Sequence, residues 1–273
     1  MSVAQIIWNV SPEFLVFSDS YAIRWYGILF SLGYILAYAI LIQSFKKERI
    51  PHIMLEKMTL AAIIGGVVGA RLGHCFFYEP IRYLHNPIEI LFVWQGGLAS
   101  HGGAVGVLIA FWIVIRKSEY SYSFLLSRAM LVVPLTGACI RLGNLMNSEI
   151  YGTETTLPWG FIFERSAEVG AHIEQAVPRH PTQLYEAGAY FLVFVVLQLL
   201  YWKSIRFNNP IKTNLIIGIF LLGIFATRFF IEFFKANQVP FESAWILNLG
   251  QILSIPFILY GMYVLFVYKF QKK

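Results

Sequence analysis

The sequence has few charged residues, since only 13% of its 273 residues are Asp, Glu, Lys or Arg, against about 25% in soluble globular domains. Hydrophobic residues make up 58% and aromatic residues 17%. This composition excludes an ordinary soluble domain and indicates an integral membrane protein. The sequence also lacks repeats, low-complexity tracts and any sign of a second domain. We therefore interpret residues 1–273 as a single polytopic membrane domain.

Cysteine is scarce as well, and both cysteines, Cys75 and Cys139, fall within apolar stretches. We expect small buried packing residues there, not a disulfide or a reactive thiol. No Lys or Arg precedes Arg24, so the first apolar segment lacks the basic start of a cleavable signal peptide. We expect it to be a retained membrane span.

Long apolar segments dominate what is present, and a membrane helix needs roughly 20 such residues. Seven segments qualify: 22–44, 58–78, 98–115, 124–146, 184–202, 213–234 and 245–268. Their length favours an all-α integral membrane fold with seven transmembrane helices. The longest segment outside them, residues 147–183, is too long for a simple turn. We expect it to form a small extracytoplasmic head between helices 4 and 5.

Basic residues gather on one side of these segments. If the amino terminus is extracytoplasmic, thirteen lysines and arginines lie on the cytoplasmic side and only Arg82, Arg165, Arg179 and Lys235 lie opposite. This asymmetry predicts that orientation, with the carboxyl terminus in the cytoplasm. It also accounts for the net charge of +6 through topology and anionic lipid. We expect no nucleic-acid partner, because no aromatic-basic recognition pattern occurs.

Four arginines, Arg24, Arg71, Arg141 and Arg228, lie at or near membrane depth. Ionisable residues there are costly and are usually retained for function, and the planar guanidinium suits phosphate. The alternative is pairing or snorkelling, and Glu232 stands four residues after Arg228, which suits an internal ion pair. Taken together, the excess of cations at this depth predicts an anionic substrate headgroup.

His101 stands in a glycine-rich run, with Gly102 and Gly103 after it and Gly96 and Gly97 before it. Glycine lets a backbone approach a ligand closely, and a helix amino terminus favours anions. The same histidine can be a satisfied core residue, but this setting favours a functional role. In the preceding segment, glycines 65, 69 and 73 recur every four residues, which predicts a close helix-packing face.

Several motifs along the chain resemble the bacterial prolipoprotein diacylglyceryl transferases. The matching residues, in chain order, are Trp25, Tyr26, Gly27; Gly69 to Gly73; His101, Gly102, Gly103; Arg141, Leu142, Gly143, Asn144, Asn147, Glu149, Gly152; His180 to Glu186; and Arg228 with Glu232. The resemblance implies a seven-helix enzyme of the bacterial inner membrane. It implies transfer of the diacylglyceryl group of phosphatidylglycerol to the lipobox cysteine of a preprolipoprotein signal peptide, with a thioether formed and glycerol phosphate released.

The resemblance also implies roles at the matching positions. His101 is the candidate base for the thiol, and it can instead hold the phosphate with Gly102 and Gly103. Arg141 and Arg228 are the candidates that stabilise the phosphate leaving group, with Tyr26 as a hydroxyl donor or a closing residue. The remaining substrate-binding candidates are Asn144, Asn147, Glu149, Gly152 and Glu232. Asn144 and Glu149 would position the glycerol head, and Glu232 would orient Arg228. No cofactor and no metal is expected.

One position departs from the resemblance: members often have tyrosine one helical turn before the late arginine, and this chain has Ile224. A hydroxyl contact is then absent or supplied by another residue. Three other classes fit less well. An anion transporter usually shows paired broken-helix repeats, a retinal photoreceptor needs a lysine in its last span, and a structural scaffold would not need the polar cluster after Arg141.

Overall fold

The structure is a computed structural model that describes residues 5–18, 21–166, 177–208, 211–235 and 247–270. It is mostly helical. The chain divides into two compact units, one formed by Met1–Ala37 with Met130–Lys273 and the other by Tyr38–Ala129. Helix α1 (Trp25–Lys47) contributes its first half to the former and its second half to the latter.

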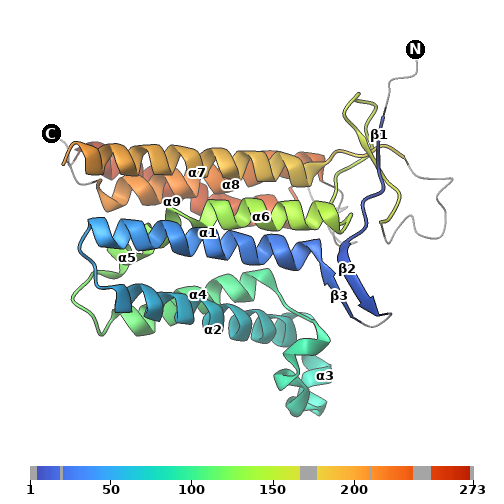
Figure 1. Cartoon of the computed structure of the whole chain (residues 1–273), viewed down its shortest axis with the longest axis horizontal. Helices are drawn as coiled ribbons and strands as arrows, with labels where there is room; N and C mark the ends of the chain where they lie inside the picture. The colour runs from blue at the N-terminus through green and yellow to red at the C-terminus, as the bar shows by residue number, and fades with distance from the viewer. Residues whose placement is uncertain (1–4, 19–20, 167–176, 209–210, 236–246, 271–273) are drawn as a thin grey trace. The chain divides into compact units, whose positions relative to one another are not determined.

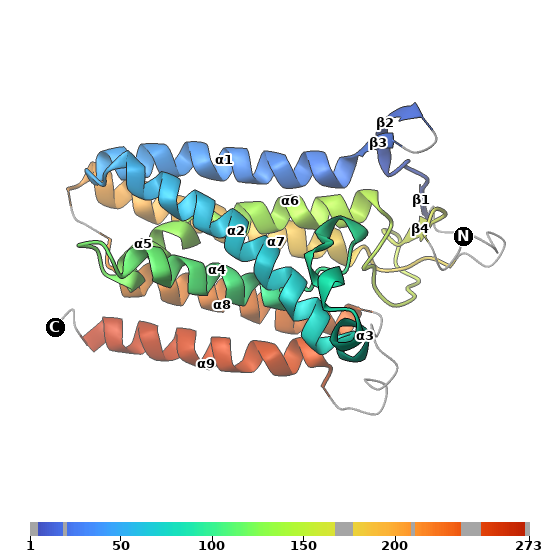
Figure 2. The same cartoon turned by 90° about the horizontal axis from the view of Figure 1, so that it is seen from below.

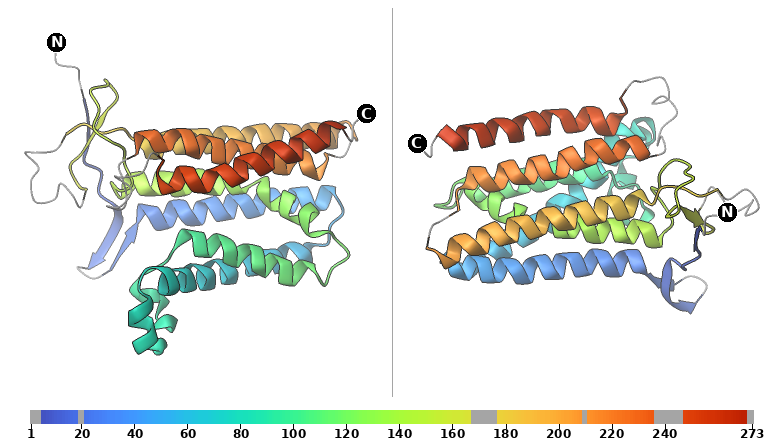
Figure 3. Two further views of the ribbon diagram at one scale, coloured as in Figure 1. Left: turned by 180° about the vertical axis from the view of Figure 1, so that it is seen from behind. Right: turned by 90° about the horizontal axis from the view of Figure 1, so that it is seen from above.

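The larger unit contains most of the long helices. They are α6 (Val133–Met146), α7 (Thr182–Arg206), α8 (Thr213–Ile231), the short 3-10 turn η4 (Glu232–Phe234) and α9 (Leu249–Phe270). Helix α7 packs against α6 and α8, and α8 packs against α9 (Figures 1 and 3). These contacts bring the carboxyl end of α6, the amino end of α7 and the carboxyl end of α8 together.

Short strands flank the helices of this unit. Strand β1 (Ile6–Trp8) pairs in parallel with β4 (Phe161–Phe163), and β2 (Glu13–Ser18) pairs antiparallel with β3 (Tyr21–Arg24). Residues 145–163 also form a buried cluster of Leu145, Tyr151, Phe161 and Phe163. Apolar contacts with the end of α6, with Trp8 and with Leu184 therefore hold the described part of the segment expected as a head, which excludes residues 167–176.

The smaller unit is built on one helix pair. Its elements are α2 (His52–Phe77), α3 (Pro80–His85), the 3-10 turns η1 (Pro87–Leu91) and η2 (Val93–Gln95), α4 (Ser100–Ile115) and α5 (Tyr122–Met130). Figure 2 shows α2 and α4 side by side. A Cβ at Gly69 would lie 2.7 Å from the Gly106 Cα, and a Cβ at Gly73 would lie 2.8 Å from the Gly102 Cα. The prediction of a close-packing glycine face is confirmed.

Among the described residues, five helices are long and apolar enough to cross a membrane: α1, α2, α7, α9, and α8 together with η4. The broken pair of α5 and α6, bent by 42°, makes up to six. Helix α4 has 16 residues, or about 24 Å at 1.5 Å per residue, less than the bilayer core of about 30 Å. The helices of the described residues therefore make the chain a multi-pass membrane protein.

The structure corrects two of the expected elements. Residues 22–24 of the first expected helix belong to β3, because two apolar residues followed by an arginine fit a hairpin strand as well as a helix. The fourth segment, 124–146, is two helices, since Pro134 opens α6 and lacks the N–H that would continue α5. The fold is mostly helical, in agreement with the expected all-α membrane fold, and the described residues add four short strands to the helices.

The remaining segments differ at their ends. The second helix begins at His52 instead of residue 58, and α7 extends from Thr182 to Arg206 beyond the expected 184–202. Residues 245–246 of the last expected segment lie outside the described residues, and α9 begins at Leu249. Cys75 and Cys139 are buried and free, as expected.

Candidate active site

Arg141, near the end of α6, is held by two neighbours. Its Nε lies 2.8 Å from Oε2 of Glu186 on α7, and its Nη1 donates to Oδ1 of Asn144 at 3.2 Å. The Arg141 side chain keeps 15% of its surface exposed, whereas Glu186 is fully buried. No hydrogen bond among the described residues uses Nη2 of Arg141. The guanidinium is therefore fixed on one side and has donors left for an anion.

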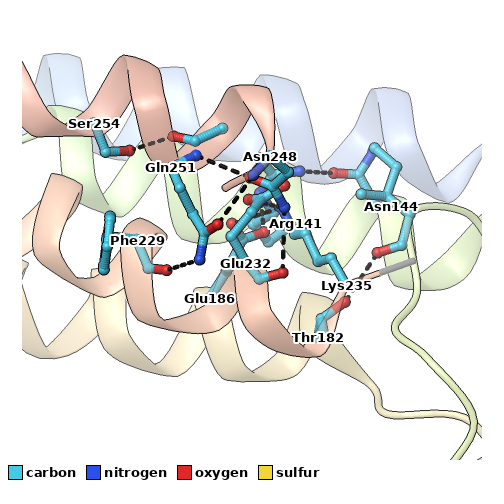
Figure 4. A network of polar contacts seen from close by, with 12 residues as sticks. Arg141, Asn144, Thr182, Glu186, Phe229, Glu232, Lys235, Asn248, Gln251 and Ser254 are labelled. Carbon is cyan, nitrogen blue, oxygen red and sulfur yellow. Dashed lines mark hydrogen bonds and ion pairs between the residues drawn. The ribbon is translucent and has the colours of Figure 1, made fainter. Parts of the chain in front are cut away.

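Lys235, directly after η4, is buried between two carboxylates. Its Nζ lies 3.0 Å from Oε1 of Glu186 and 3.4 Å from Oε2 of Glu232. Figure 4 shows Arg141, Glu186, Lys235 and Glu232 converging from α6, α7 and the end of α8. Burying charged groups is tolerated when each is paired, and this arrangement pairs both carboxylates with cations.

The expected ion pair between Arg228 and Glu232 is wrong. Glu232 pairs with Lys235 instead, and Arg228 makes none of the ion pairs in the described part of the chain. The reason is local backbone geometry. The α-helix ends at Ile231 and continues as the 3-10 turn η4, in which side chains three residues apart lie over each other. Glu232 therefore cannot orient Arg228 through an ion pair.

Arg228 has a different neighbour, the hydroxyl of Tyr190 on α7. That hydroxyl also lies 3.5 Å from Oε1 of Glu186. Tyr190 packs in a buried cluster to which Ile224 contributes. Tyr190 thus supplies a hydroxyl beside Arg228, next to the position where Ile224 replaces the tyrosine frequent in the resembling family.

The turn after α6 presents Glu149. Its Oε1 accepts from Nδ2 of Asn144 at 2.8 Å and from Nδ2 of Asn147 at 3.2 Å. Its neighbours Ser148 and Ile150 have φ of 52° and 59°, a conformation that is uncommon for non-glycine residues and strained for a β-branched one. Such strain, on the order of 1–3 kcal/mol per residue, is typical of functional turns.

Two residues at the amino end of α7 bind the backbone of this strained turn. Gln183 donates from Nε2 to the Glu149 carbonyl at 2.7 Å, and Thr182 donates from Oγ1 to the Ile150 carbonyl at 3.1 Å. Both side chains are fully buried. The amino end of α7 therefore fixes the backbone of Glu149, while the amides of Asn144 in α6 and of Asn147 directly after it fix its carboxylate.

Tyr26 and Gly152 occupy close-packed positions around this cluster. A Cβ at Gly143 would lie 2.8 Å from Cδ2 of Tyr26, so glycine there lets α6 approach the start of α1. Gly152 is buried, and its backbone pairs with that of Lys235. A Cβ at Gly152 would lie 2.6 Å from the Cβ of His180. The geometry thus gives Gly152 a packing function beside the candidate site.

His180 precedes α7 and lies 8% exposed. Its Nδ1 lies 3.2 Å from the Tyr185 hydroxyl, to which Trp159 donates from Nε1 at 3.0 Å. Burial lowers the pKa of His180 below its ordinary value, because removal from water disfavours the charged imidazolium. The imidazole is therefore neutral at neutral pH.

His101, Gly102 and Gly103 belong to the smaller unit, in the first turn of α4. The His101 side chain is exposed and takes part in none of the hydrogen bonds of the described residues. The free side of Gly102 meets the Gly69 carbonyl, and a Cβ at Gly103 would lie 3.3 Å from the Gly66 carbonyl. These glycines therefore let α4 pack closely on α2. The sequence had led us to expect that they let the backbone approach a ligand.

Arg71 of α2 holds the turn that leads into α4. Its guanidinium donates to the carbonyls of Glu89 at 2.5 Å, Ile90 at 3.0 Å and Gly96 at 2.7 Å. The side chain is 3% exposed and stacks over Tyr83 at 5.1 Å. Arg71 therefore has a structural role, whereas Arg24 is exposed on β3 without an ion pair in the described part of the chain.

The structure thus brings together one set of candidates: Tyr26, Arg141, Asn144, Asn147, Glu149, Gly152, Arg228 and Glu232. Sequence reasoning missed Glu186 and Lys235. Glu186 carried a usable signal, since a carboxylate inside an apolar segment is a functional candidate by default. Lys235 had only the signal of a basic residue at a segment end.

Fold and site define a class first: a multi-pass helical membrane protein with a buried, cation-rich cluster suited to an anionic group. The family model of prolipoprotein diacylglyceryl transferase matches residues 12–267. The chain belongs to this family and is a transferase of lipoprotein maturation.

Three relatives carry the name phosphatidylglycerol–prolipoprotein diacylglyceryl transferase. A protein of Tolumonas auensis is 43% identical over 94% of this chain and 95% of its own length. A protein of Bacteroides fragilis is 40% identical over 96% and 95%, and a protein of Porphyromonas gingivalis is 43% identical over 96% and 94%. The similarity therefore extends over nearly the whole chain.

Proposed function

We propose that this chain transfers the diacylglyceryl group of phosphatidylglycerol to the lipobox cysteine of a preprolipoprotein signal peptide. The cysteine thiolate attacks the carbon of the diacylglyceryl group that is bonded to the phosphate oxygen. The carbon–sulfur bond forms, the carbon–oxygen bond breaks with its electron pair on the phosphate oxygen, and glycerol phosphate leaves. The family and the names of the relatives support the reaction.

One observation carries the assignment of the anion site: among the described residues, Arg141 and Arg228 both keep N–H donors that bind no carboxylate. Arg141 is 15% exposed and donates only from one edge, and Arg228 has no ion pair among the described residues. Fixed cations of this kind stabilise the charge that develops on the phosphate oxygen, by several kcal/mol in a dry site. Asn144 and Glu149 would position the glycerol head.

The thiol needs a base, since a free cysteine has a pKa of about 8.5. We assign this role to His101, with Tyr26 as a hydroxyl that contacts the phosphate or closes the site. The exposure of His101 and the lack of a competing hydrogen bond among the described residues support the assignment. Gly102, Gly103, Asn147, Gly152 and Glu232 complete the proposed substrate-binding set.

We also propose seven spans in a bacterial inner membrane, with the head and the amino terminus extracytoplasmic. The short α4 carries no Asp, Glu, Lys or Arg. The bent pair of α5 and α6 is, taken together, long and apolar enough for one span. The basic residues favour this orientation. A reporter inserted between Thr156 and Leu157 is expected to be active only outside, and one after Lys273 only inside. The reverse pattern would contradict the orientation.

The direct test is a transfer assay with purified protein. We expect a lipobox peptide incubated with phosphatidylglycerol to gain one diacylglyceryl group by mass spectrometry, with glycerol phosphate released in equal amount. Two matched controls, a peptide with serine in place of cysteine and phosphatidylethanolamine in place of phosphatidylglycerol, should give no product. Equal product with phosphatidylethanolamine would refute the proposed lipid, and no product under any condition would refute the activity.

A further inference from the structure

The charge arrangement around Glu186 is more than pairwise. Glu186 is fully buried, yet Arg141 and Lys235 both approach it, at 2.8 and 3.0 Å. A carboxylate that served only to neutralise Arg141 would need no second cation. Lys235 also reaches Glu232 at 3.4 Å, so one lysine contacts both carboxylates of the cluster (Figure 4).

The balance of charge follows from these contacts. Within the ion-paired network, the charges of Arg141 and Lys235 balance those of Glu186 and Glu232, while the Glu149 carboxylate is held by the amides of Asn144 and Asn147. Arg228 makes none of the ion pairs of the described residues, so its charge is left for the single negative charge of a phosphodiester. Without Lys235 the two carboxylates would cancel both arginines, because unpaired buried carboxylates draw on the nearest cation.

The geometry adds a second effect. Glu186 holds Nε of Arg141, and Asn144 holds Nη1, so the guanidinium plane is fixed by two contacts. A planar fork held in this way presents its remaining donors in one direction. The backbone pairing of Lys235 with Gly152 fixes the lysine end of the network in turn.

We propose that Glu186 and Lys235 are positioning residues for Arg141: Glu186 fixes its guanidinium, and Lys235 neutralises the two carboxylates so that the arginines keep their attraction for the lipid phosphate. Neither residue touches substrate. The inference rests on the proposed function only through the identity of the anion. It assigns charge balance to Lys235 and geometry to Glu186.

The two roles separate in steady-state kinetics. Lys235→Met removes the charge, so we expect KM for phosphatidylglycerol to rise about tenfold or more. Glu186→Gln keeps the size of the side chain and raises the positive charge of the cluster by one, but it loosens Arg141, so we expect kcat to fall by about 10²-fold, as for a misplaced catalytic group, with KM no higher than in the wild type. In the double variant the charge balance returns, and KM should return to the wild-type value while kcat stays low. Lys235→Arg should remain close to wild type.

The matched control is a second buried ion pair in the smaller unit. Nε of Arg128 lies 2.7 Å from Oε2 of Glu48, with side chains 4% and 14% exposed. Glu48→Gln breaks a comparable pair, so it should lower the melting temperature while kcat and KM per folded molecule stay unchanged. This control separates loss of stability from loss of positioning.

Each outcome decides the proposal. An unchanged KM in folded Lys235→Met, or a KM in the double variant as high as in Lys235→Met, would overturn the charge balance. If Lys235→Met does not fold, Glu186→Gln decides alone, and an unchanged kcat overturns the positioning role. Titration of short-chain phosphatidylglycerol against wild type and variants gives the same affinities without turnover. Wild type that binds this lipid without transfer would refute the function and leave the inference standing.

Discussion

The contact between α2 and α4 gives a prediction in which one substitution can be compared at two positions of one helix. At Gly69 an added Cβ would lie 2.7 Å from the Gly106 Cα and even closer to the Gly102 carbonyl. At Gly66, one turn away, the nearest atom is Cγ2 of Val107 at 3.6 Å, an ordinary van der Waals contact. We therefore expect Gly69→Ala to force the helices apart and Gly66→Ala to fit without movement.

The magnitude follows from the same geometry. Overpacking typically costs about 1–3 kcal/mol, whereas glycine to alanine in a helix gains up to about 1 kcal/mol in propensity. Since both variants make the same substitution on α2, the propensity terms cancel in their difference. We expect Gly69→Ala to be about 1–3 kcal/mol less stable than Gly66→Ala. At about 2–4 °C per kcal/mol, its melting temperature should be lower by several degrees.

Thermal unfolding of both variants in one detergent measures this difference. Activity provides a second readout, because α4 carries His101 in its first turn and a displaced α4 moves that residue. We expect Gly69→Ala to lose activity per folded molecule and Gly66→Ala to keep it. If the two variants melt at the same temperature, the close packing of α2 and α4 is wrong.

Three further predictions concern single side chains. Arg141→Lys should lower transfer by about 10²-fold, because a lysine cannot contact Glu186 and Asn144 together and still reach phosphate; near-normal rate constants would remove Arg141 from the site. His101→Gln should lose about 10²- to 10⁴-fold in rate, with a deficit that shrinks from about pH 6.5 to about pH 9 as the thiol ionises unaided; the same deficit at both values would mean that the histidine only binds. Burial lowers the pKa of His180 below its ordinary value of 6.5, so near and below pH 6.5 the unfolded state binds more protons than the folded state, and the stability of the protein falls as the pH falls. We expect the melting temperature of His180→Gln to fall less with decreasing pH than that of the wild type. An equal fall in both proteins would contradict the burial effect.

Much of the helical architecture could be predicted from composition and apolar length. The segments around α2, α7, α8 and α9 were found because roughly 20 apolar residues in a row have few alternatives. The glycine spacing of α2 predicted its packing face correctly, since residues four apart share one side of a helix. Apolar length failed where local chemistry intervenes, at Pro134 within the fourth segment and at the hairpin strand that contains Arg24.

The candidate site was predictable as a set of motifs, whereas its pairings were not. Glu232 stands four residues after Arg228, which favours an ion pair on an α-helix. A change from α-helix to 3-10 turn after Ile231 gives that carboxylate to Lys235. The position at which the α-helix ends therefore decides which cation pairs with Glu232, and sequence patterns predict helix ends poorly. Glu186 lies 45 residues beyond Arg141, so only the packing of α6 on α7 brings them together.

These pairings explain how a membrane protein can keep several charges beside an anionic lipid. Glu186 is shared between Arg141 and Lys235, and Lys235 also contacts Glu232. The cations that remain incompletely neutralised, Arg141 and Arg228, are the two that we assign to phosphate. A lone arginine in an apolar setting would attract any anion, whereas an arginine fixed by Glu186 and Asn144 presents its free donors in one direction. On the proposed assignment, Glu186 restricts the geometry of Arg141 while Lys235 preserves the charge of the arginines, and Glu149 would offer acceptors for hydroxyl groups next to the phosphate. A phosphodiester with a hydroxylated head satisfies both features, which is the chemistry of phosphatidylglycerol.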